Sequence, residues 1–438
     1  KNKLKFFVDT LQSSFWFLPI IIIFAALGMA FGLLQIDSKY SYMPESGFLV
    51  FILSGGAESA RTVLSTIAGA MLGMATTVFS ITLVVLTLAS SQFGSRLLRN
   101  FMYDRLNQVV LGTFISTFVY CLVILKAVHS ESDLKFVPNF SILFAELLTL
   151  GNIILLIVFI HHTSVSIQAD KVISDISDQL HKDVQKHFSF NQQNKAIDEG
   201  ENFDKEKSKY LFRKSVMNIK SGYMQTLDYA TVTDIASEND LLIEFHNRPG
   251  DFLVEGIELI LINCKDDVEE AIIKKIRNAF IIGKIRSPAQ DIEFAIHQLV
   301  EVASRALSPG VNDPYTALTC IDQLTVTLSH LVQVNFPGNY RYDKKDRLRL
   351  KIKVLTLDGA MNAAFNQIRQ YGQASPTILI RMMERLHAIY SLAKQEEQQS
   401  VVLKHAKMVL AAGKENIIEE NDITDLEERY RMFVASKN

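Results

Sequence analysis

The sequence is poor in cysteine and carries little net charge. Its 438 residues have a formal net charge of −2, and the three cysteines are scattered at Cys121, Cys264 and Cys320. With no CxxC pair and no Cys/His ligand spacing, disulfides and a structural zinc site are not expected, and a reduced cytosol suits the soluble part. No basic patch is interleaved with aromatic residues, so the sequence gives no indication of nucleic-acid binding.

The chain also lacks the short motifs that mark common enzyme classes. It has no GxSxG elbow, Walker loop, GxGxxG before a helix, HExxH pair or protein-kinase set. No pattern of residues places a nucleophile beside a base. The sequence therefore predicts a protein that is not an enzyme, and it indicates no cofactor and no metal.

What the chain does contain is a series of long apolar segments, all within residues 1–165. Four of them reach the roughly 20 apolar residues that a membrane helix requires, and they cover residues 15–36, 62–90, 109–128 and 140–161. The first is too long for a signal peptide and has no small-residue cleavage site, so we interpret it as a spanning helix.

Lysine and arginine gather on one side of these expected spans. Arg96, Arg99 and Arg105 follow the second span, Lys171 follows the fourth, and lysines precede the first. The loops on the other side mix lysine with glutamate and aspartate. The positive-inside rule then predicts a multi-pass membrane protein with both termini in the cytosol.

The second segment is unusually long and rich in small and hydroxylated residues. At about 1.5 Å per residue, residues 62–90 extend roughly 43 Å, more than a hydrocarbon core of ~30 Å. These side chains recur near helical spacing and form one stripe: Thr62, Thr66, Gly69, Gly73, Thr77, Ser80, Thr87 and Ser91. Such a stripe indicates either close helix packing, within the protomer or in an oligomer, or the lining of a pore. In a pore, Arg96 and Arg99 would stand at the inner mouth.

Several polar residues fall within or at the end of the later spans. Glu146 and Asn152 lie inside the fourth span, and Lys126 lies at the outer end of the third. Because ionisable groups are rare at membrane depth, we expect Glu146 to pair with Lys126. His161 and His162 close the fourth span. We expect them to be interfacial side chains, with metal binding or pH sensing as the alternative.

The remaining residues predict a cytosolic α+β domain in three parts. Residues 166–210 are predicted to form a helical extension and a polar linker, residues 211–265 a small β-rich module, and residues 266–438 a helical domain. The amphipathic helix of the extension is expected to continue the fourth span.

The β-rich module has a recognisable order of elements. Its pattern predicts strands over 221–228, 241–246 and 257–263, and a short helix over 229–237 that Asp228 caps. With the Pro-Gly turn at 248–251, this order resembles half of a barrel-sandwich hybrid, the small β fold of biotinyl and lipoyl carriers. No lysine occupies the turn. A structural or oligomerising module is therefore expected, without covalent cofactor attachment.

From residue 269 onward the pattern predicts helices, over 269–282, 289–307, 315–333, 347–371, 377–396, 400–413 and 422–436. The motif SPGVNDP at 308–314 joins two of them, with Asp313 as the N-cap of the second helix and Pro314 in its first turn. A functional alternative is an anion held at this helix start by the segment with Asn312 and Asp313, helped by Arg305.

One face of the helix before this motif carries ionisable residues. Glu293, His297, Glu301 and Arg305 fall at successive i+4 steps. Two carboxylates and a histidine could hold a divalent ion. An ion-pair ladder explains the same spacing, because Glu301 precedes Arg305 in the favourable order. We interpret this face as a ladder.

Several strings of the sequence together resemble one family. They are SITLVVLTLASSQFGSRLLRNF at 80–101, NQVVLGTFISTFVYCLVIL at 107–125, FIHH and SIQAD within 159–170, SGYMQTLD at 221–228, RPGDF at 248–252 and RALSPGVNDPYTAL at 305–318. They are similar to the bacterial predicted-membrane-protein family known as domain of unknown function 2254. The resemblance implies a bacterial inner (plasma) membrane protein with N-terminal spans and a cytosolic C-terminal part. It implies no activity, cofactor or catalytic residue.

These observations predict a mainly α membrane protein with a four-helix transmembrane block and a cytosolic α+β domain. The leading functional hypothesis is a homo-oligomeric ion channel in the lipid bilayer, with the second span lining its axis, small ions as the permeating species, and the cytosolic part assembling or gating it. The alternative is a non-conducting scaffold or sensor that binds a ligand or partner through its cytosolic domain.

Overall fold

The computed structural model describes residues 16–39, 56–94, 104–128, 136–187, 199–288 and 290–435. The chain divides into two compact units, Lys1–Lys171 and Val172–Asn438. We call them the membrane unit and the C-terminal unit.

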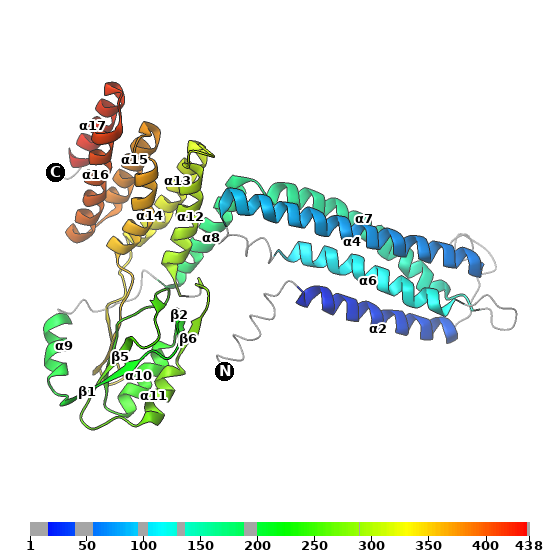
Figure 1. The fold of residues 1–438 in the computed structure, drawn as a ribbon, viewed down its shortest axis with the longest axis horizontal. Coiled ribbons are helices and arrows are strands. Elements are labelled where there is room, and N and C mark those ends of the chain that lie inside the picture. Colours follow the sequence, from blue (N-terminus) through cyan, green and yellow to red (C-terminus); the bar gives the residue numbers. More distant parts are fainter. Residues whose placement is uncertain are drawn as a thin grey trace. The chain divides into compact units, whose positions relative to one another are not determined.

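The membrane unit contains four helices that are long and apolar enough to cross a bilayer, as the sequence predicts. They are α2 (Phe17–Lys39), α4 (Ala57–Phe93), α6 (Arg105–Ala127) and α7 (Asn139–Ser166). Helix α6 packs against the other three and is the most buried of the four (Figure 1). The described part of the protein is therefore a multi-pass membrane protein with the fold class that its sequence predicts.

Local signals set the ends of these helices. Asp104 caps α6, where its side chain accepts a hydrogen bond of 2.9 Å from the amide of Leu106. Helix α4 ends at Phe93 and is followed by Gly94, whose φ of 101° suits glycine. Helix α7 ends at Ser166, and a separate helix, α8 (Ala169–His187), begins after Ile167 and Gln168. The expected continuous extension of the fourth span is therefore two helices.

The C-terminal unit is built around two sheets. The five-stranded sheet has the order β1 (Phe212–Met217), β5 (Glu258–Cys264), β3 (Leu242–Phe245), β8 (Leu348–Lys351), β7 (Tyr340–Tyr342). The three-stranded sheet has the order β4 (Phe252–Leu253), β2 (Gly222–Leu227), β6 (Phe280–Gly283). All pairs are antiparallel except β3 with β8, which places Ile243 beside Leu350.

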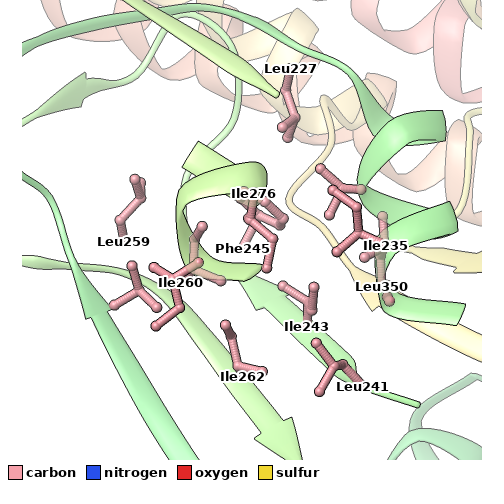
Figure 2. Packing of buried hydrophobic residues seen from close by; sticks show 14 of the residues in the cluster. Leu227, Ile235, Leu241, Ile243, Phe245, Leu259, Ile260, Ile262, Ile276 and Leu350 are labelled. Carbon is pink, nitrogen blue, oxygen red and sulfur yellow. The ribbon is translucent and has the colours of Figure 1, made fainter. Parts of the chain in front are cut away.

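Two short helices cover the core of these sheets. They are α10 (Tyr229–Glu238) and α11 (Glu270–Arg277). Figure 2 shows Ile235 of α10 and Ile276 of α11 with Ile243, Ile260 and Leu350 of the sheet in one buried cluster. Asp228 caps α10 as predicted, because its side chain accepts a hydrogen bond of 3.1 Å from the amide of Thr231.

A further group of six helices belongs to the described part of the C-terminal unit, and each packs both on an adjacent helix and on the next helix but one in the sequence (Figure 1). They are α12 (Ile292–Ala306), α13 (Pro314–Leu331), α14 (Leu357–Tyr371), α15 (Pro376–Leu392), α16 (Glu396–Asn416) and α17 (Glu420–Ala435). Helix α8 joins this group, since Ser177 donates a hydrogen bond of 2.7 Å to Gln323 of α13.

Three further sequence-based assignments, all in the C-terminal unit, are wrong. Residues 280–283 form strand β6 and not the end of a helix, because they pair with β2. Residues 348–351 form strand β8 and not the start of α14, so β structure extends beyond residue 265. The polar segment expected as a linker contains helix α9 (Glu199–Lys207), in which Phe203 is 3% exposed and packs with Leu242 and Leu348.

Candidate functional site

The stripe of small and hydroxylated residues lies on the outer face of α4. At about 100° per residue, it lies directly opposite the buried positions of the same helix. Those buried positions, which pack in the core of the membrane unit, are Ala60, Leu64, Ile67, Met71, Ala75 and Val78. Every predicted member of the stripe is exposed: Thr62, Thr66, Gly69, Gly73, Thr77, Ser80, Thr87 and Ser91. Packing of the stripe against the described helices of its own protomer is thereby excluded.

The stripe faces open space, and its threonine hydroxyls are hydrogen-bonded. A Cβ atom placed on Gly69 or Gly73 would meet nothing within 4 Å. The threonine hydroxyls donate to carbonyl groups of their own helix, for example Thr66 to Thr62 at 2.8 Å and Thr77 to Gly73 at 3.0 Å. Each such oxygen still has lone pairs to offer as an acceptor. Large apolar side chains, including Leu72 and Leu88, flank the stripe and are exposed.

Arg96 and Arg99, predicted at the inner mouth, lie outside the described residues. Asn152 of the fourth span is buried and donates from Nδ2 to Thr117 of α6 at 2.8 Å and to the sulfur of Met71 in α4 at 3.3 Å. It therefore ties three helices together. Its burial and pairing give it a structural role.

The ion pair expected between Glu146 and Lys126 does not form. Glu146 is half-buried and Lys126 is exposed, and no salt bridge joins them among the described residues. The expectation rested on the rarity of ionisable groups at membrane depth, but Glu146 is only half-buried and Lys126 is exposed, so neither needs the other as a partner.

A buried carboxylate that sequence reasoning missed fixes the start of α7. Asp37, near the end of α2, is 4% exposed and accepts hydrogen bonds of 3.0 Å from the amides of Phe140 and Ser141. Because the N-cap position of α7 is Pro138, Asp37 does the capping from another helix. Tyr120 of α6 adds a hydrogen bond of 2.9 Å to the carbonyl of Ser141. The sequence feature that could have indicated this role is a single aspartate at the end of an apolar segment.

The two histidines at the end of α7 differ in environment. His161 is exposed. His162 is half-buried, and its Nε2 lies 2.5 Å from Oδ2 of Asp104 at the start of α6. The pair lines a largely apolar pocket of about 150 Å³, and Phe79 and Leu83 of α4 are among its other lining residues. Among the described residues, no group of three or more histidine, cysteine or acidic side chains is arranged to hold a metal.

The second candidate site is a hollow of about 270 Å³ in the C-terminal unit. Its lining comes from the starts of α10 and α12, the turn after β3, and the segments flanking β7 and β8. The lining residues are Tyr229, Arg248, Pro249, Gln290, Asp291, Ile292, Glu293, Pro337, Arg341, Lys353, Val354 and Leu355. We call this feature the Arg248 hollow.

The turn that carries Arg248 is fixed by its own sequence. The backbone amide of Arg248 donates to the Asp251 carboxylate at 3.1 Å, and the amide of Asp251 donates to the Arg248 carbonyl at 3.0 Å. Gly250 has a φ of 98°, and a Cβ there would collide with the carboxylate of Asp291. Glycine at this position therefore allows the turn to approach the start of α12 closely.

Charged groups of the hollow are largely paired. Arg248 Nη2 lies 2.6 Å from Oε2 of Glu293, and Arg286 approaches the same carboxylate at 3.6 Å. Arg286 also holds both oxygens of the buried Asp291, which caps α12. Burial alone would lower the pKa of Arg286, but the hydrogen bonds to Asp291 raise it above its ordinary value. The acidic side chains are thus neutralised by arginine.

The predicted face of α12 is divided between different partners. Glu293 pairs outside its helix, with Arg248, and Nδ1 of His297 lies 3.4 Å from Nη1 of Arg286. Glu301 and Arg305 are half-buried one and two turns further along. The interpretation as a ladder within one helix therefore fails for Glu293, because a turn 45 residues earlier in the chain supplies its arginine.

The SPGVNDP motif has the structural role that the sequence predicts. Asp313 caps α13 by accepting a hydrogen bond of 3.1 Å from the amide of Thr316, and Pro314 begins the helix. The hydrogen bonds from Thr316 lower the pKa of the Asp313 carboxyl group. Asn312 is exposed and adopts a φ of 51°, which asparagine tolerates.

Comparison with known proteins places the chain among membrane proteins. The family model described as "Predicted membrane protein (DUF2254)" matches residues 12–388, which include all four membrane helices and end within α15. Uncharacterized protein Rv1290c of Mycobacterium tuberculosis and Uncharacterized protein Mb1321c of Mycobacterium bovis are each 28% identical over 445 residues, covering 96% of this chain and 80% of the relative. No solved structure matches the chain significantly. The chain therefore belongs to the predicted membrane protein family DUF2254.

Proposed function

We propose that the protein is a homo-oligomeric channel for small ions, in which the α4 helices of several protomers face a common axis. The observation that supports this proposal is the position of the stripe on α4, opposite the buried face and exposed in the protomer. The role is transport and not catalysis. The C-terminal unit would lie in the cytosol and assemble or gate the channel.

The chemistry of the stripe suits this role better than contact with lipid. Small residues expose backbone and leave gaps against hydrocarbon chains, whereas they allow neighbouring helices to approach closely. Threonine and serine oxygens offer acceptors to water or to an ion, even while their protons are used within the helix. The large apolar side chains that flank the stripe suit lipid or adjacent protomers.

Ion flux in liposomes containing the purified full chain tests the proposal. Gly73→Trp should abolish flux, because the new ring would project from the stripe into the axis, while the open space around Gly73 lets the protomer fold. Leu72→Trp is the matched control, since Leu72 is 49% exposed on the flank of the same turn. Flux that survives Gly73→Trp, or that Leu72→Trp abolishes equally, would contradict the assignment of α4 to the pore.

The Arg248 hollow supports a second candidate function, a non-conducting sensor that binds a ligand through its C-terminal unit. Its lining combines charged side chains with apolar walls, as binding sites for small molecules do. A compact, non-conducting dimer in the same liposome preparations would favour the sensor over the channel. A ring of three or more protomers that conducts would favour the channel.

A further inference from the structure

The Arg248 hollow has the features of a site for one class of small molecule. Its volume of about 270 Å³ is close to the lower end of the range for small-molecule pockets, ~300–1,000 Å³. Residues from five separate stretches of the C-terminal unit meet there.

The lining favours an anion. Three of its side chains are cationic: Arg248, Arg341 and Lys353. Its two acidic side chains, Asp291 and Glu293, are already held by arginine. The lining therefore has three cationic side chains against two acidic ones, and this net positive charge favours an anion over a cation.

Arg248 has donor capacity left for a ligand. Its Nη2 binds Glu293 at 2.6 Å, and its Nε lies 4.0 Å from Asp251. Its Nη1 makes no hydrogen bond within the described part of the chain, and this atom is not buried. This nitrogen therefore remains accessible. Lys353, 56% exposed and 3.5 Å from Asp251, supplies a second positive charge that can reorient toward an anion.

The lining also includes apolar side chains and one aromatic ring. The guanidinium of Arg341 lies over the ring of Tyr229 with its carbon 5.7 Å from the ring centroid. Pro249, Ile292 and Pro337 contribute apolar walls. A planar or aromatic body can pack against such walls, whereas a bare inorganic ion would leave them unfilled.

We propose that the Arg248 hollow binds a small organic anion, a phosphate ester or carboxylate with a planar apolar body. The anionic group contacts Arg248 and Lys353, and the planar body packs beside Tyr229 and Arg341. This proposal is independent of ion conduction, because it concerns only the C-terminal unit.

Calorimetric titration of the full chain in detergent tests the site with defined probes. The probes are phenyl phosphate and benzoate as anions, benzyl alcohol as the neutral analogue, benzylamine as the cationic analogue, and inorganic phosphate. Phenyl phosphate or benzoate should bind at least tenfold more tightly than benzyl alcohol or benzylamine. The tighter of the two anions identifies the head group that the hollow prefers. Equal affinity for the neutral and anionic probes would overturn the proposal. So would the absence of binding of both anions at concentrations up to about 10 mM.

Substitutions of lining residues test whether the anion binds in the Arg248 hollow. Arg248→Gln and Lys353→Gln should each weaken binding of the preferred anion about tenfold or more, and Lys353 is exposed enough that its replacement preserves the fold. Tyr229→Leu should weaken the aromatic anions but leave inorganic phosphate unchanged. Lys284→Gln is the matched control, because Lys284 is exposed and does not line the hollow. Binding that Lys353→Gln and Tyr229→Leu leave intact would place the anion elsewhere and refute the assignment.

Discussion

The carboxylate of Asp37 holds Ser141 through two hydrogen bonds, from its amide at 3.0 Å and from its hydroxyl at 2.6 Å. This contact joins the end of α2 to the start of α7 across 104 positions of sequence. It replaces the cap that Pro138 cannot provide, and it leaves a charged group buried within the membrane unit.

Replacing Asp37 by alanine should destabilise the membrane unit by about 2 kcal/mol, because the α7 amides lose a charged acceptor in a buried place. Thermal unfolding of the detergent-solubilised protein measures the effect. Ser38→Ala is the control, since the exposed Ser38 hydroxyl donates only to the carbonyl of Gln35 in its own helix. Equal melting of the two variants would show that the Asp37 contact contributes little.

Cysteines placed on the α4 stripe should form disulfides between protomers. In a chain whose three native cysteines are replaced, Gly69→Cys and Gly73→Cys should give cross-linked species in the membrane after mild oxidation. Leu72→Cys, on the flank of the helix, should cross-link several-fold less. Gel mobility under non-reducing conditions reads out the result. The absence of any position-dependent difference would argue against a specific assembly through this face.

Removing Arg286 should strand a buried negative charge. Asp291 is 4% exposed and has both oxygens hydrogen-bonded to Arg286, so Arg286→Met should cost the C-terminal unit about 3 kcal/mol. Adding Asp291→Ser removes the charge and retains a side chain able to cap α12, so the double variant should recover much of the loss. Chemical denaturation of the three proteins compares them. If the double variant is no more stable than Arg286→Met, the stranded charge is not the cause.

The stability of the region around α16 should decrease as the pH is lowered from about 6.5 to about 4. Burial lowers the pKa of His405 from 6.5 to about 4, so below pH 6.5 the unfolded chain binds a proton that the folded chain excludes. The folded state therefore loses up to ~3 kcal/mol as the pH falls across this window. Hydrogen exchange of α16 amides, corrected for the intrinsic pH dependence, measures it.

His405→Gln should flatten this pH dependence, because the group that takes up the proton on unfolding is gone. His387→Gln, in the neighbouring α15, should retain it. A pH profile of α16 exchange that is the same in the two variants would assign the effect to other groups.

Features that depend on local periodicity were predictable. The four spans were predicted from apolar length alone, and the α4 stripe was predicted from helical spacing. The structure agrees with both predictions. Caps at Asp228 and Asp313 also follow from residues within four positions of each other. In each case the physical cause lies within one or two helical turns.

Features that depend on distant partners were not predictable in the same way. The apolar run at 280–283 is too short to separate strand from helix, and only its pairing with β2 decides. The segment at 348–351 alternates apolar and basic residues, a strand signal that the helical pattern after it obscured. The Arg248–Glu293 contact depends on a turn and a helix that only the tertiary fold brings together.

The parallel pairing of β3 with β8 has a consequence for biosynthesis. Strand β3 leaves the ribosome about a hundred residues before its neighbour, and the α12–α13 hairpin is made in between. One edge of β3 therefore remains unpaired until β8 emerges. A nascent chain that stalls within this interval exposes the unpaired edge of a strand to other chains, which can pair with it and aggregate. Chaperone binding should therefore matter most during this interval.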